Sequence, residues 1–151
     1  MIIKSLDHLQ LISKKIADKI SEIDCIFLIG EIGVGKTTFT RCLINYVQKR
    51  EGVKQTEVLS PTFNLLYEYD IKKLKIMHYD LYRIKDHKEL DQLGIFSDNT
   101  NSIKIIEWPH LLENNVTDVL EIHLNYSKNE KERKLLFVGK GKWKNFNLDE
   151  L

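Results

Sequence analysis

The segment that most constrains this chain is a glycine-rich octapeptide between two apolar stretches. Residues 30–37 read Gly-Glu-Ile-Gly-Val-Gly-Lys-Thr, and they directly follow the apolar run Cys25 to Ile29, which is typical of a buried strand. The next residues, 38–49, keep helical spacing. A strand, a loop of this glycine–lysine–threonine pattern and a helix together form a P-loop, whose backbone N–H groups bind phosphates. The sequence therefore predicts a nucleoside triphosphate site after the first buried strand.

Individual residues of this loop have predicted roles. Gly30 and Gly35 permit the tight turn, because glycine adopts backbone conformations that other residues avoid. Lys36 is expected to reach the β- and γ-phosphates, and the Thr37 hydroxyl to bind Mg²⁺. Thr38 either offers a second hydroxyl to the α-phosphate or is an ordinary residue at the helix N-terminus, whose partial positive charge also favours phosphate. We expect the nucleotide to contact Gly33, Val34, Gly35, Lys36, Thr37 and Thr38.

Length and composition limit the classes of protein to which the chain can belong. Its 151 residues, 42% hydrophobic and 30% charged, predict one domain spanning residues 1–151. A net charge of +1 argues against tight binding of nucleic acid by this chain alone, so we expect any contact with RNA to be indirect. No apolar stretch approaches the length of about 18 residues that predicts a membrane span. The chain contains two cysteines and no Cys-x-x-Cys pattern, which favours buried thiols in a reducing, cytoplasmic compartment.

The order of the remaining elements predicts an α/β fold. We expect a mostly parallel central sheet with an antiparallel hairpin, a late antiparallel strand pair, and helices on both faces. The expected helices run from a Ser5 cap to about Ile20, over residues 38–49, and from an Asp86 cap to Leu93; the expected later strands are 64–71, 74–80, 102–106, 120–126 and 134–138. Ligands of such sheets bind at the carboxyl ends of the strands. The P-loop, Asp80 and Glu107 all follow apolar strands, so we expect them to converge on one crevice.

Two acidic residues are candidates for the chemistry of this crevice. Mg²⁺ requires hard oxygen ligands, and Glu107, at the end of the apolar run 103–106, is the predicted carboxylate for the ion. The alternative is a solvated charge at a strand end. Asp80 is predicted to orient or deprotonate the attacking water, although a structural ion pair with Arg83 would also explain it. His78 is interpreted as a hydrogen-bonded core residue rather than a base.

Three further segments allow two interpretations each. Ser60 and Thr62 lie in Ser-Pro-Thr-Phe, which is either a switch loop, with Thr62 sensing the γ-phosphate or metal, or a rigid proline turn. Trp108 could form a wall of the pocket or belong to the core. The lysine-rich segment 131–144 could contact nucleotide, RNA or an acidic partner, or it could be a solvated face.

Four sequence blocks together resemble the TsaE (YjeE) family. They are residues 30–38, Ser-Pro-Thr-Phe at 60–63, His-Tyr-Asp-Leu-Tyr-Arg at 78–83 and Glu-Trp-Pro at 107–109. The resemblance spans nearly the whole chain. It implies a P-loop ATPase that uses ATP and Mg²⁺ and is required for threonylcarbamoyl modification of the adenosine beside the tRNA anticodon. It also implies TsaB and TsaD as partners, with tRNA contacted only indirectly.

The resemblance also implies residue roles. By motif, Thr37 and Glu107 would hold Mg²⁺, Lys36 would bind the phosphates and act in catalysis, Asp80 would serve hydrolysis, Trp108 would lie near the nucleotide, and Leu6 and Arg133 would contact it. Two positions depart from the family pattern. Glu31 replaces an aspartate that is frequent in the family, and the tail after Gly141 matches no family pattern.

Two other functions stay open at this stage. A small-molecule kinase would use segment 131–144 as a lid, but kinases usually close several arginines over the phosphates and this chain has few. A non-catalytic, ATP-gated assembly module would bind ATP and partners while hydrolysis stays incidental. A GTPase is disfavoured because no Asn-Lys-x-Asp stretch occurs. We carry forward Mg²⁺-dependent ATP hydrolysis, slow in the isolated chain because no arginine finger is identifiable.

Overall fold

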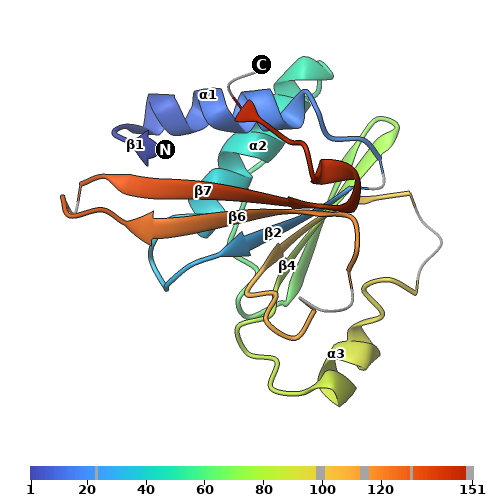
Figure 1. The fold of residues 1–151 in the computed structure, drawn as a ribbon. Helices are drawn as coiled ribbons and strands as arrows, with labels where there is room; N and C mark the ends of the chain where they lie inside the picture. The colour runs from blue at the N-terminus through green and yellow to red at the C-terminus, as the bar shows by residue number, and fades with distance from the viewer. Residues whose placement is uncertain (23, 98–100, 113–115, 130, 149–151) are drawn as a thin grey trace.

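A seven-stranded sheet runs through the structure, a computed structural model that describes residues 1–22, 24–97, 101–112, 116–129 and 131–148 (Figure 1). The strand order is β1-β7-β6-β2-β5-β4-β3. The four central strands are parallel: β6 (Val119–Tyr126), β2 (Cys25–Ile29), β5 (Ile103–Glu107) and β4 (Leu74–Asp80). The flanking strands pair antiparallel with their neighbours: β7 (Arg133–Lys140) pairs with β6, β1 (Ile2–Ile3) pairs with β7, and β3 (Leu66–Ile71) pairs with β4. The predicted parallel centre, hairpin and late antiparallel pair are confirmed.

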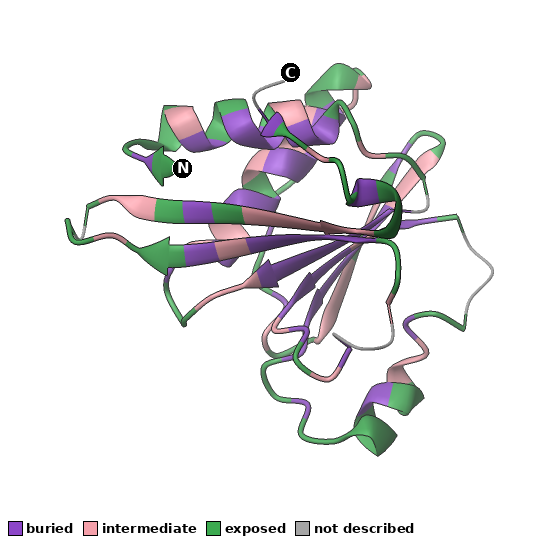
Figure 2. Cartoon of the chain, viewed as in Figure 1, coloured by how far each residue is buried: buried purple, intermediate pink, exposed green. Residues whose placement is uncertain are grey.

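Helices lie on both faces of this sheet, as predicted. Helices α1 (Leu6–Ala17) and α2 (Lys36–Arg50) cover one face and share its larger hydrophobic core, while α3 (His87–Leu93) and neighbouring loops cover part of the other. Figure 2 shows the central strands largely buried between these layers. The predicted caps are confirmed, because the side chains of Ser5 and Asp86 accept hydrogen bonds from the backbone N–H groups of His8 and Glu89. No helix in the described part of the chain is long and apolar enough to cross a lipid bilayer.

The two ends of the chain differ from the prediction. Helix α1 ends at Ala17 instead of near Ile20, and the two-residue strand β1 was too short for its pattern to be recognised. The tail beyond Gly141, which matched no pattern, forms the short 3₁₀ turn η1 (Gly141–Trp143) and buries Trp143 in the core. This turn lies so close to β7 that a Cβ atom on Gly139 would be 1.7 Å from the Trp143 carbonyl oxygen. The described part of the tail, up to residue 148, is therefore packed against the core of the fold.

Strand order and register bring the predicted residues to one edge of the sheet. Asp80 and Glu107 are register partners on β4 and β5, and Glu107 is also opposite Leu28 on β2. The P-loop follows β2 and is fixed against β6, because Gly30 has φ +153° and a Cβ atom there would be 2.3 Å from the carbonyl oxygen of Leu124. Only glycine fits this position without displacing the backbone.

Candidate nucleotide-binding site

Lys36 lies inside the P-loop at the first position of α2. Its Nζ donates hydrogen bonds to the carbonyl oxygens of Gly30 (2.8 Å) and Glu31 (2.9 Å), and lies 4.1 Å from the ring centroid of Trp108. Burial lowers the pKa of Lys36, and the carboxylates of Glu107 and Asp80 act in the opposite direction. The ammonium group is therefore held beside the loop by neutral carbonyl oxygens. Phosphate oxygens could replace them, because a hydrogen bond from an ammonium group to an anion is stronger than one to a neutral oxygen.

Both predicted carboxylates lie beside this lysine and are almost completely buried, with 3% of Asp80 and 2% of Glu107 exposed. The Thr37 hydroxyl donates to Glu107 Oε1 at 2.9 Å. The Thr62 hydroxyl donates to Asp80 Oδ2 at 2.7 Å, and the backbone N–H of Tyr82 donates to Asp80 Oδ1 at 2.9 Å. The interpretation of Glu107 as a solvated strand-end charge is wrong, because its side chain is buried and hydrogen-bonded.

The alternative ion pair between Asp80 and Arg83 is not found either. The Arg83 guanidinium lies 5.6 Å from the ring centroid of Phe63, and the hydrogen-bond partners of the Asp80 carboxylate in the described residues are Thr62 and Tyr82. Arg83 therefore packs on the Ser60–Phe63 loop rather than neutralising Asp80. Within that loop the hydroxyls of Ser60 and Thr62 are 2.8 Å apart, so the loop is linked directly to Asp80.

Trp108 combines the two interpretations offered for it. It is partly buried and packs on the smaller hydrophobic core. It also lines the cavity that contains Lys36, and its ring centroid lies 5.0 Å from that of Tyr82. Its φ of +58° is rare for a side chain of this size. The chain thus turns sharply after Glu107 and sets the indole beside Lys36.

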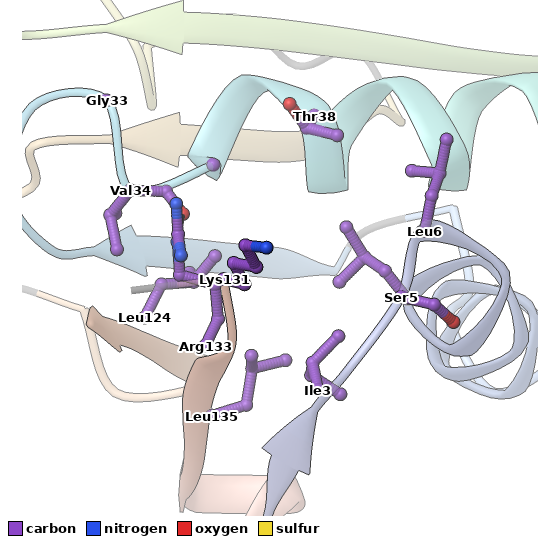
Figure 3. A pocket seen from close by; sticks show the side chains of 12 residues that line it. Ile3, Ser5, Leu6, Gly33, Val34, Thr38, Leu124, Lys131, Arg133 and Leu135 are labelled. Carbon is purple, nitrogen blue, oxygen red and sulfur yellow. Dashed lines mark hydrogen bonds between the residues drawn. The ribbon is translucent and has the colours of Figure 1, made fainter. Parts of the chain in front are cut away.

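Two adjoining cavities lie along the P-loop. The phosphate-side cavity, of about 250 Å³, is lined by Lys36, Thr37, Thr62, Asp80, Glu107 and Trp108, among others. The apolar cavity, of about 320 Å³, is lined by Ile3, Leu6, Leu9, Leu124 and Leu135, with Lys131 and Arg133 (Figure 3). Gly33, Gly35 and Thr38 line both cavities, which therefore form two ends of one groove.

Arg133 links the apolar cavity to the P-loop. Its Nε donates to the carbonyl oxygen of Val34 at 3.0 Å, and its guanidinium lies 4.4 Å from the ring centroid of Tyr126. Leu6 lies across the same cavity on α1 (Figure 3). The structure therefore brings Leu6 and Arg133, which only the family resemblance had indicated, to the groove that contains Val34 and Thr38.

The structure divides the lysine-rich segment 131–144. Lys131 lines the apolar cavity, whereas Lys140 pairs with Glu121 and Lys142 pairs with Asp24, away from both cavities. Such ion pairs show that this part of the segment serves the fold rather than forming a lid.

Comparison with known proteins identifies the family. The family model of the threonylcarbamoyl adenosine biosynthesis protein TsaE matches residues 3–135. The chain belongs to the TsaE family. It is similar to two proteins named tRNA threonylcarbamoyladenosine biosynthesis protein TsaE. The protein of Rickettsia prowazekii is 35% identical over 79% of this chain and 81% of its own length. The protein of Rickettsia conorii is 32% identical over 85% of this chain and 72% of its own length. The crystal structure of Bacillus subtilis YdiB, 26% identical, superposes with a TM-score of 0.74 over 99% of this chain and 90% of that one.

The TsaE match contains all four sequence blocks, and the structure adds residues to them that sequence reasoning missed. Tyr82 and Ile32 line the phosphate-side cavity, and His78 Nε2 lies 2.9 Å from Glu107 Oε1. Spacing carried a signal for His78, because residues two apart on a strand point to the same face and Asp80 was already a candidate. The residues Ile3, Leu9, Leu124 and Leu135 of the apolar cavity carried no such signal, since their meeting depends on long-range strand pairing.

Proposed function

We propose that this TsaE-family chain binds Mg²⁺·ATP in the groove and hydrolyses it as the nucleotide-driven subunit of tRNA threonylcarbamoyladenosine biosynthesis. The observation that supports this best is the meeting of Lys36, Thr37, Asp80 and Glu107 in one cavity at the carboxyl ends of adjoining parallel strands. Loop N–H groups, the N-terminus of α2 and the Lys36 ammonium would bind the phosphates. We propose a cytoplasmic location, which the free thiols of Cys25, which is buried, and Cys42, which is only partly buried, support.

The oxygen atoms around Thr37 suit Mg²⁺. A hydroxyl that donates its proton to a carboxylate keeps lone pairs for a cation, so Thr37 can bind the ion while its O–H remains bonded to Glu107. Hydroxyl, carboxylate and phosphate oxygens are the hard ligands that this ion takes. In our proposal Thr37 and Glu107 would hold the ion, whose chemistry there would be to neutralise charge on the phosphates.

Asp80 would orient the attacking water and accept its proton. The Thr62 hydroxyl and the Tyr82 backbone N–H fix its two oxygens, so the carboxylate has a defined direction in the cavity.

None of the arginines lines the phosphate-side cavity. Arg41 and Arg50 donate hydrogen bonds to the carbonyl oxygens of Val58 and Ala17. Arg83 packs on Phe63, and Arg133 lies at the apolar cavity. Without such a charge, hydrolysis by the isolated chain should be slow.

The apolar cavity supports adenine as the base. Guanine presents N–H donors that proteins commonly satisfy with a carboxylate, and no Asp or Glu lines this cavity in the described residues. Aliphatic side chains such as Leu6 and Leu135, together with the planar guanidinium of Arg133 in the same lining, instead suit a flat ring.

TsaB and TsaD, which the family resemblance implies, are the proposed partners. Exposed apolar side chains lie on and next to the lining of the phosphate-side cavity. Ile32 and Tyr82 line it, and Phe63, which is 83% exposed, directly follows the lining residue Thr62. Exposed apolar groups of this size favour a protein contact. The net charge of +1 supports only an indirect contact with tRNA.

A binding and turnover experiment tests the proposal. ATP binding and phosphate release are measured for the wild-type chain with Mg²⁺ and with EDTA, alone and with TsaB and TsaD. Asp80→Asn should bind ATP within about threefold of wild type and lose about 100-fold or more in turnover. ATP-dependent capture of TsaB–TsaD, compared with ADP and no nucleotide, tests the partnership.

Two outcomes would favour the alternative functions. If Asp80→Asn supported tRNA modification without turnover, the chain would be a nucleotide-gated assembly module. If a phosphorylated acceptor appeared instead of free phosphate, it would be a kinase. Failure to bind ATP would remove all three hypotheses.

A further inference from the structure

A buried polar side chain beside the proposed site has no role in the mechanism described above. His78 on β4 is completely inaccessible to solvent, and its Nε2 lies 2.9 Å from Glu107 Oε1. It precedes Asp80 by two residues and therefore points to the same face of the sheet. His78 does not line either cavity. Its side-chain hydrogen bond to a residue of the phosphate-side cavity is the one with Glu107.

The contact fixes which nitrogen carries the proton. An ionised carboxylate only accepts hydrogen bonds, so a neutral imidazole that faces it must donate from Nε2. Nδ1 is then a lone-pair acceptor, and this atom is buried without a hydrogen-bond partner. An unpartnered buried acceptor is unusual and disfavours the folded state. An aliphatic side chain would fill the same space without that disadvantage, so the contact with Glu107 is the feature that histidine adds.

Two donors converge on a single oxygen of Glu107. Oε1 accepts from both the Thr37 hydroxyl and His78, which uses its two lone-pair directions. Oε2 accepts no hydrogen bond from any residue that the structure describes. A glutamate side chain has more rotatable bonds than an aspartate and needs more contacts to hold one orientation.

We propose that His78 is a positioning residue for Glu107. His78 and Thr37 together hold Oε1. Oε2, which accepts no hydrogen bond from the described residues, would then be the oxygen that Glu107 offers to Mg²⁺. The inference rests on the proposed function, because it takes the phosphate-side cavity to bind Mg²⁺·ATP. A histidine that merely fills the core would leave metal-dependent binding unchanged, which makes the two roles separable.

The chain offers a matched control. His123 on β6 forms a second histidine–glutamate contact, with its Nε2 3.2 Å from Glu121 Oε2, outside both cavities. Substitution of His123 removes the same kind of contact without touching the proposed site.

The experiment compares ATP affinity in Mg²⁺ with ATP affinity in EDTA, by calorimetry, for wild type, His78→Met, His78→Gln and His123→Met. Residues that orient metal ligands typically contribute about 10- to 100-fold to metal affinity. His78→Met should lose that factor in Mg²⁺ only, with its affinity in EDTA unchanged. His78→Gln, which keeps an N–H donor, should recover most of it, and His123→Met should match wild type. An unchanged Mg²⁺-to-EDTA ratio in His78→Met would overturn the proposal.

A measurement on the wild-type chain covers the case in which His78→Met does not fold. Nitrogen-15 NMR of the histidine rings should show His78 as the Nε2–H tautomer, with a resonance that Mg²⁺·ATP shifts more than ATP in EDTA does. The Nδ1–H tautomer, or equal shifts under both conditions, would contradict the inference. If wild-type protein itself showed no Mg²⁺-dependent binding of ATP, the proposed function would fail instead.

Discussion

The two ends of the groove are built in different ways. In the phosphate-side cavity, charged and hydroxyl side chains from the ends of adjoining strands and the P-loop are joined by hydrogen bonds of 2.7–2.9 Å. The apolar cavity collects aliphatic side chains from α1, β1, β6 and β7, with Arg133 at one wall. In the proposed function this difference separates chemistry from recognition: one end would present fixed charges to a phosphate chain, and the other would present a shape to a flat ring. Inorganic triphosphate, which lacks the ring, can therefore test each end independently.

A change at the first residue of the P-loop, which carries residues of both cavities, should give the largest effect. Gly30→Ala places a methyl group against the Leu124 carbonyl oxygen, 2.3 Å away, in a left-handed conformation. Overpacking and backbone strain together should lower the free energy of unfolding by about 3 kcal/mol and weaken binding of both ATP and triphosphate. Gly52→Ala is the control, because Gly52 has φ +68° and no atom near its Cβ position. Urea unfolding that gave equal losses for both variants would show that only strain matters.

Removing the Lys36 ammonium should disable the phosphate-side cavity alone. Lys36→Ala should weaken ATP and inorganic triphosphate alike by about 100-fold, equivalent to about 2.7 kcal/mol. Titration calorimetry with both ligands measures this. Lys14→Ala is the control, since Lys14 also lies over an aromatic ring, that of Tyr46, but far from the groove. A loss limited to ATP would contradict the assignment of Lys36 to the phosphates.

A change at the opposite end should separate the two ligands. Arg133→Met keeps an unbranched chain like the aliphatic part of arginine, but it removes the guanidinium that donates to the Val34 carbonyl oxygen. ATP affinity should fall by about 5- to 10-fold, while triphosphate affinity stays within about twofold. Equal weakening of both ligands would mean that Arg133 serves the phosphates, and the contrast between the cavities would then be wrong.

A residue outside both cavities should affect stability without affecting binding. Burial raises the pKa of Cys25 to about 12, whereas the ordinary value is 9.0. The protonated thiol therefore stabilises the fold fully below pH 9, and this contribution is lost as pH rises toward 12. Between pH 7 and 9.5, wild type should lose about 0.8 kcal/mol more stability than Cys25→Ala, as measured by urea unfolding. ATP affinity should be the same in both proteins. Equal losses would mean that the thiol is solvated.

The same contrast explains how much could be predicted from the sequence. The phosphate-side residues each end an apolar strand or occupy a loop motif, so topology alone predicted that Asp80 and Glu107 would meet. Strand β2 and the cap of α3 were likewise predictable, because local patterning determines them.

The apolar cavity could not be predicted in this way. Its wall of Ile3 and Leu135 exists because β1 pairs with β7, about 130 residues away along the chain. Two-residue strands and single aliphatic residues carry no periodic signal. The burial of Trp143 was missed for the same reason: it depends on the close approach of Gly139, which only the folded chain reveals.

The indole of Trp108 gives this molecule an optical reporter of its own state. A cation 4.1 Å from the ring centroid alters the excited state of the indole, and the partner of that cation would change if Lys36 exchanged the neutral loop carbonyls for a bound anion. Trp143, sealed in the core away from the groove, would supply a constant background emission. Occupancy could therefore be followed in real time by intrinsic fluorescence, with no dye attached.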